Sequence, residues 1–342
     1  MPRHVSRFIV FTTAVFVPLA TACSSRGERQ TTGSVSESSA AGATVASTSA
    51  TAAGSDDKAA PTSAAPAAPA SYADADRTFH DGRYEEASAM FRTYTETHPD
   101  NVWGHYMLGL SAWRNGDDSL ALEGFDAALR LEPAHRKSLF NSARVLLETG
   151  RPQNALDRVQ QALAAEPLSS EGLRLLGRVR YELGQTDQAI DAYQRALALD
   201  ERDVWAMNNL GYIYIQQGRS TEALPPLARA VELRPAGPVF QNNFATALER
   251  SGHITSAREA YEAALAADST YEKAAVGLER VNALGAESDT SAVDVAALSQ
   301  AFQADVEQWQ TRSAIVDSTT VGSATVIDSA PVAATPSDTA AP

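Results

Sequence analysis

The sequence predicts an all-α fold, a right-handed α-solenoid of six helix-turn-helix units with a C-terminal capping helix and disordered tails. Three observations predict it. Glycine recurs every 34 residues without slippage, at Gly82, Gly116, Gly150, Gly184, Gly218 and Gly252. Alanine follows each glycine after five residues, and a bulky apolar residue follows after nine. A fixed period of this length is typical of stacked hairpins, each of which buries its apolar face only against its neighbours.

The two ends of the chain lack the composition of a folded domain. Residues 24–70 are almost all Ser, Ala, Thr, Gly and Pro, and residues 286–342 are similar with added acid. Neither segment carries enough large apolar side chains to offset the entropy of ordering. We therefore place the folded domain at residues 71–285, with residues 23–70 as a tether and residues 286–342 as an acidic tail.

Residues 1–22 have the features of an export signal. Arg3 and Arg7 precede the apolar run Phe8–Ala20, which is too short for a comfortable membrane span. An A-x-A cleavage site ends at Ala22, and cleavage there would release a secreted protein.

The same segment resembles a bacterial lipoprotein signal, in which the cysteine after the cut carries lipid. Cys23 is the only cysteine of the chain and follows the predicted cut. We favour lipidation over plain secretion and expect a cell-envelope protein that faces the periplasm, anchored in the outer membrane by Cys23. Secretion stays the alternative.

Each unit is built from local requirements. The units span residues 68–101, 102–135, 136–169, 170–203, 204–237 and 238–271. The recurring glycine, such as Gly218, takes the left-handed conformation that ends the first helix. Small residues such as Gly211 and Ala223 let the two helices approach closely. Proline closes four of the units because it cannot continue a helix.

Two segments of the folded domain depart from the plain repeat. Residues 272–285 are expected to form the capping helix, with Ala275, Leu278 and Asn282 at first-helix places. Pro225 and Pro226 fall in the second turn of a second helix, where proline costs about 3 kcal/mol, so we expect a late start or a kink.

Residues 293–312 have the period of an amphipathic helix. Its apolar face comprises Val295, Leu298, Phe302, Val306 and Trp309. We expect this helix to pack loosely on the solenoid. The alternative is a regulatory helix that occupies the protein's own groove.

The repeat resembles the tetratricopeptide repeat family over about residues 68–271. Leu108-Gly109, Leu176-Gly177 and Leu210-Gly211 match its first-helix signature, and the second helices match A-x-x-x-F-x-x-A. The resemblance implies that the first helices line a concave groove, with the second, fifth, sixth and ninth places of each pointing inward. The candidate partner-binding residues are therefore Trp103, Tyr106, Lys137, Asn141, Arg144, Arg174, Arg178, Trp205, Asn208, Asn209, Tyr212, Asn242, Asn243 and Lys273.

These residue types suit an extended peptide. Asparagine offers a donor and an acceptor to a peptide backbone, and Trp and Tyr supply contact area with a polar end. Several of the candidates are bases, although residues 71–285 hold 22 bases against 30 acids. We therefore expect a scaffold for protein or peptide partners, and the bases favour acidic side chains or a terminal carboxylate.

Other function classes find little support. The chain has no H-E-x-x-H, no G-x-S-x-G, no glycine-rich phosphate loop and no Cys/His cluster, so we predict no enzyme activity, no cofactor and no metal. A net charge of −14 disfavours nucleic acid. A pilotin-like assembly role, for a type IV pilus or a secretion-system secretin, stays an alternative. Glycan binding through Trp103 and Trp205 also stays open.

Overall fold

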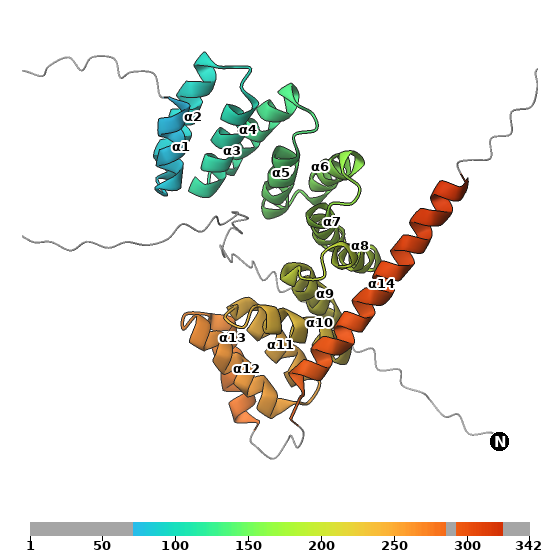
Figure 1. Ribbon diagram of the computed structural model, residues 1–342. Helices are drawn as coiled ribbons and strands as arrows, with labels where there is room; N and C mark the ends of the chain where they lie inside the picture. Colours follow the sequence, from blue (N-terminus) through green and yellow to red (C-terminus); the bar gives the residue numbers. More distant parts are fainter. Residues whose placement is uncertain (1–70, 285–291, 324–342) are drawn as a thin grey trace, which may run out of the picture. The chain divides into compact units, whose positions relative to one another are not determined.

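The computed structural model describes residues 71–284 and 292–323, with side chains to residue 312 in the second segment. The export signal, Cys23 and the tether lie outside the described residues. Within them the chain is helical (Figure 1). The first helices of the six hairpins are α1 (Tyr72–His80), α3 (Val102–Asn115), α5 (Arg136–Glu148), α7 (Ser170–Glu182), α9 (Val204–Gln216) and α11 (Pro238–Arg250). The second helices are α2 (Tyr84–Thr97), α4 (Asp118–Leu131), α6 (Pro152–Ala165), α8 (Thr186–Leu199), α10 (Ser220–Leu233) and α12 (Ile254–Ala267). Two helices follow, α13 (Glu272–Ala283) and α14 (Val295–Ser323).

The hairpins stack in chain order, as the predicted α-solenoid requires. Each second helix contacts the first helix of its own hairpin and the first helix of the next (Figure 1). The buried residues are mainly the alanines and bulky apolar side chains of the repeat, such as Ala223 and Leu227. The core therefore runs along the stack instead of forming one central cluster.

Gly211 and Gly218 of the fifth hairpin are required for different reasons. Gly218 has φ of 75°, in the left-handed region, and the N–H of Arg219 donates to the Tyr214 carbonyl at 2.8 Å. This bond closes the end of α9. Gly211 lies against α10, where an added Cβ would lie 2.8 Å from Leu227 Cδ2. Carbon atoms in contact lie about 3.5–4.0 Å apart, so a side chain at Gly211 would force the two helices apart.

The predicted late start of α10 is wrong. The helix begins at Ser220, two residues after its turn glycine as in the other hairpins, and runs unbroken through Pro225 and Pro226 to Leu233. The prolines leave the carbonyls of Thr221 and Glu222 without a helical donor. Both of these residues are exposed, so water can satisfy the two carbonyls.

The helix α13 covers the end of the stack, as predicted. The side of α13 that is buried is shifted by about one residue from the predicted side. Ala274, Gly277 and Val281 are buried, whereas Ala275 and Asn282 are exposed. Glu279, which stands 34 residues after Ala245 and 68 after Gly211, is also exposed. A glutamate at the place where the repeat needs a small residue cannot accept a close second helix, which explains why the stack ends here.

The helix α14 packs against the second helices α10 and α8 (Figure 1). It does not occupy the side of the first helices, so the regulatory alternative is wrong as stated. Phe302 and Val306 are each 2% exposed, and Ser299 bonds to the Glu232 carboxylate near the end of α10. The packing is thus tighter than the loose contact that the sequence suggested. None of the described helices is both long and apolar enough to cross a bilayer.

Candidate partner-binding site

The first helices of neighbouring hairpins meet on one side of the stack. Each contacts the next, from α1 with α3 through to α11 with α13. The second helices make their main contacts with first helices and with α14, not with one another. We call the surface formed by α3, α5, α7, α9, α11 and α13 the first-helix face. All of the candidate residues lie on these helices.

An aromatic cluster lies at the α3 end of the first-helix face. Trp103 is 47% exposed, and the His135 ring packs edge-on against it with centroids 5.0 Å apart. His135 also contacts the Tyr106 ring at 5.4 Å and bonds to the Ser138 hydroxyl at 2.7 Å. Burial lowers the pKa of His135, so this imidazole is neutral at pH 7. The Lys137 ammonium lies 5.0 Å from the Trp103 ring centroid, within cation–π range.

Asn141 and Arg144 are bonded within the protein. Asn141 donates to the Tyr106 hydroxyl at 3.2 Å and accepts from Arg144 at 2.6 Å. Arg144 is 8% exposed and pairs with Glu171 of the next hairpin at 2.5 Å. Burial lowers the pKa of Arg144 and the Glu171 carboxylate opposes that shift. Arg144 therefore joins two hairpins and has little surface left for a partner.

Arg174 is engaged in the same way. Its Nε donates to Asp203 at 2.8 Å, and both side chains are largely buried. Asp203 also caps α9, because its other oxygen accepts from the backbone N–H groups of Trp205 and Ala206. The positive charge of Arg174 is thus neutralised by the cap of the next hairpin.

The paired asparagines form a chain of side-chain bonds. Asn242 donates to Asn243 at 3.2 Å, and Asn243 donates to Asn208 at 2.8 Å across the hairpin boundary. The Asn208 amide nitrogen lies 3.5 Å from the Asn209 oxygen, at the limit of a hydrogen bond. Asn208 and Asn242 are buried. These amides mostly form hydrogen bonds with one another. They therefore offer a partner fewer free donors and acceptors than the sequence suggested.

A second accessible cluster lies at α7 and α9. Tyr212 is 40% exposed, and its ring lies edge-on 6.0 Å from that of Tyr181. Arg178, one turn before Tyr181, is half-buried and forms no ion pair with any described residue. Burial raises the pKa of the Tyr193 hydroxyl, and the positive charge of Arg178 opposes that shift.

The last two candidates differ in exposure. Trp205 is partly buried, with its ring 4.9 Å from Phe240. Lys273 is exposed and makes no ion pair with the described side chains. The accessible candidates of the first-helix face are therefore Trp103, Lys137, Arg178, Tyr212 and Lys273.

Three family models match the chain in agreement with this geometry. Tetratricopeptide repeat models match residues 72–138 and 204–234, and a TPR repeat model matches residues 177–218. The matched residues of the chain are tetratricopeptide repeats. These repeats form protein-interaction scaffolds, which agrees with an extended face in place of a single deep pocket.

Solved tetratricopeptide repeat structures share the fold. A chain of the APC/C hetero-tetramer Cut9–Hcn1 matches with a TM-score of 0.54 and 18% identity, over 60% of this chain and 41% of the other. A thermophilic TPR protein of Thermus thermophilus, TTC0263, matches at 0.47 and 21%, over 54% and 100%. MamA of Desulfovibrio magneticus RS-1 matches at 0.44 and 24%, over 47% and 91%. No sequence among curated proteins matches the chain.

Sequence reasoning missed the acids that neutralise the arginines, and it missed His135. The spacing of the repeats gives a signal for other bonds between hairpins, although not for these. Tyr106 and Asn141, Asn208 and Asn243, and Trp113 and Glu148 are all bonded pairs 35 residues apart. One repeat plus one residue brings two first-helix places into register, so polar pairs at this interval predict bonds between hairpins.

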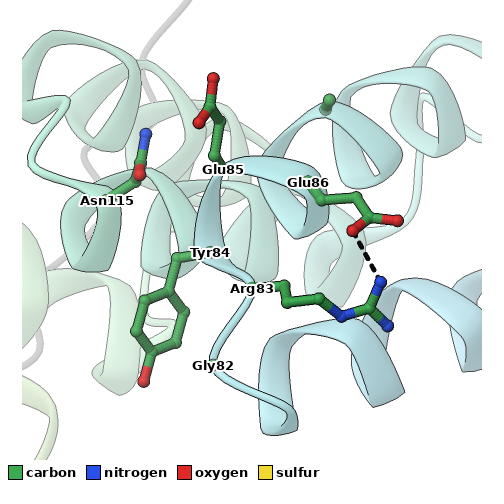
Figure 2. Close-up of a pocket in the computed structure, with 7 residues that line it drawn as sticks. Gly82, Arg83, Tyr84, Glu85, Glu86 and Asn115 are labelled. Carbon is green, nitrogen blue, oxygen red and sulfur yellow. Dashed lines mark hydrogen bonds and ion pairs between the residues drawn. The ribbon is translucent and has the colours of Figure 1, made fainter.

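One hollow of the surface is formed mainly by residues of α2 and the turn before it. It has a volume of about 610 Å³ and lies at the start of α2 (Figure 2). Arg83 pairs there with Glu86 at 2.7 Å, while Tyr84 and Glu85 point in opposite directions (Figure 2). Its polar groups do not converge on one point, so we do not assign it a ligand. Among the described residues, no group of three His, Cys, Asp or Glu is arranged to hold a metal ion.

Proposed function

We propose that this tetratricopeptide repeat protein is a non-enzymatic scaffold that binds an extended segment of a protein partner along its first-helix face. The observation that carries the proposal is the pairing of exposed aromatic rings with unneutralised cations on that face. Trp103 lies beside Lys137. Tyr212 lies on α9, the first helix that follows α7, and α7 carries Arg178. Exposed Trp, Tyr and Arg side chains are the types that dominate binding energy at interfaces.

An extended partner fits this face better than a small ligand. The two clusters lie on different hairpins, Trp103 on α3 and Tyr212 on α9. A single small molecule cannot contact both, whereas an extended chain covers about 3.3 Å per residue. The family resemblance adds that peptides are bound along first helices.

We further propose that the protein is exported and held at a bacterial membrane through lipid on Cys23. The apolar run after Arg3 and Arg7, and the lone cysteine at the predicted cut, support this proposal. Residues 23–70 would then act as the tether between membrane and repeats. About 47 flexible residues have a root-mean-square reach of roughly 35–40 Å, enough to keep the repeats clear of the headgroups.

Two measurements test these proposals separately. The full chain is expressed in a bacterial host with two membranes, and its N-terminal peptide is weighed by mass spectrometry. A diacylated peptide beginning at Cys23 is expected, and an unmodified peptide beginning there would leave secretion as the mechanism. Loss of secretin multimers in a deletion strain would instead favour the pilotin-like role.

Peptide binding is tested with an immobilised library of unstructured twelve-residue peptides. The wild-type protein should select a subset, and Tyr212→Ala with Trp103→Ala should lose most of that binding. The matched control is Arg92→Glu, an exposed position on α2 away from the first-helix face. If the double variant binds as the wild type does, the first-helix face is not the site.

A further inference from the structure

The cations of the first-helix face divide into two classes. Arg144, Arg174 and Arg280 are each paired with an acid of a neighbouring hairpin, Glu171, Asp203 and Glu249 respectively. Lys137, Arg178 and Lys273 form no ion pair with the described residues. The six helices that form this face carry ten Arg and Lys residues against six Glu residues, so their net charge is positive. This holds although residues 71–285 are acidic as a whole.

The acids that pair with Arg174 and Arg280 are not available to a basic partner. Asp203 is largely buried and holds both Arg174 and the start of α9. The Glu249 carboxylate receives two guanidinium bonds from Arg280 and one bond from the Tyr261 hydroxyl. A basic side chain of a partner would have to displace these bonds, whereas an acidic one meets free cations.

Arg178 is the best placed of the free cations. It is half-buried, so its charge is less screened than that of the exposed Lys137 and Lys273. Glu182, one turn along α7, makes no ion pair with it among the described side chains. Tyr181 and Tyr212 form the neighbouring part of the face, with their rings 6.0 Å apart.

From this we infer that the partner segment carries an acidic side chain, which Arg178 binds, with an apolar or aromatic residue beside it that packs on Tyr212. The inference rests on the proposed function and names the partner's chemistry. A carboxylate can accept two parallel bonds from the guanidinium, the arrangement that makes such contacts strong and directional. Lys137, whose ammonium lies over the Trp103 ring, provides a second cation at the α3 end of the same face. Three scattered cations on a chain of charge −14 do not suit a nucleic acid.

The test uses the same twelve-residue peptide library with the full chain. Peptides that bind should be enriched in Asp and Glu near an aromatic residue. For one selected peptide labelled with fluorescein, replacing its acid by the matching amide should weaken binding about 10-fold or more, as expected for one charge-assisted bond. The affinity should also fall as NaCl is raised.

The variants then locate the contact. Arg178→Glu should abolish most of the difference between the acidic peptide and its amide, whereas Arg92→Glu makes the same charge change on α2 and should keep it. A peptide with lysine in place of the acid should bind Arg178→Glu better than it binds the wild type. Circular dichroism confirms that both variants stay folded.

The outcomes separate the two levels of the proposal. If no peptide binds at all, the proposed function fails. If peptides bind without enrichment in acid, or if Arg178→Glu discriminates acid from amide as the wild type does, the proposed function stands and this inference is overturned.

Discussion

The arginines of the first-helix face should respond to charge reversal in opposite ways. Arg144→Glu removes two bonds of 2.6 and 2.5 Å and places a carboxylate beside Glu171. Breaking a mostly buried pair costs about 3–5 kcal/mol. Arg178→Glu breaks no ion pair and should change the free energy of unfolding by about 0.5 kcal/mol or less.

Thermal unfolding followed by circular dichroism tests this difference. For a folded domain of this size, 1 kcal/mol shifts Tm by about 2–4 °C, so Arg144→Glu should lower Tm by roughly 6–20 °C. Arg178→Glu and the control Arg92→Glu should melt within a few degrees of the wild type. If Arg178→Glu melts as early as Arg144→Glu, Arg178 has a structural partner and the division of the cations is mistaken. An unchanged Tm for Arg144→Glu would show that its pair with Glu171 is too exposed to matter.

Three further predictions concern stability and local order. Gly211→Ala should destabilise the protein by about 1–3 kcal/mol through crowding against Leu227, more than the roughly 1 kcal/mol gained in helix propensity, and an unchanged urea midpoint would exclude the crowding. Phe302→Ala should undock α14, so hydrogen exchange should rise in residues 295–309 while α3 and α4 stay protected; a uniform rise would contradict local docking. Because burial lowers the pKa of His135, its contribution is full above about pH 6.5 and is lost as the pH falls toward the lowered value. His135→Gln should therefore show a smaller fall in urea midpoint between pH 7 and pH 5 than the wild type. An equal fall in both proteins would show that His135 does not cause the pH dependence.

The hairpins could be predicted because each depends on local requirements. The left-handed turn at Gly218 and the close approach at Gly211 are needed in every unit, so they recur on the period and become visible in one sequence. The expected late start of α10 was wrong because proline was judged by its average cost in a helix. Here the carbonyls that lose donors belong to exposed residues, and water lowers that cost.

The candidate site was harder to predict, because it depends on which side chains of different hairpins meet. Composition placed Arg144, Arg174 and Arg178 in one class, although only the first two face an acid of the next hairpin. The amphipathic face of residues 293–312 indicated that this helix would pack somewhere. It did not distinguish the first helices from α8 and α10, since both sides of a hairpin offer apolar surface.

The helix α9 connects the two surfaces. Tyr212 lies on the first-helix face, whereas Tyr214, two residues later, lines a hollow with Phe302 and Trp309 of α14. Residues two apart on a helix point to nearly opposite sides, so one helix can serve both surfaces without a shared side chain. The helix α14 therefore meets α9 on the side of Tyr214 and leaves the partner surface at Tyr212 uncovered.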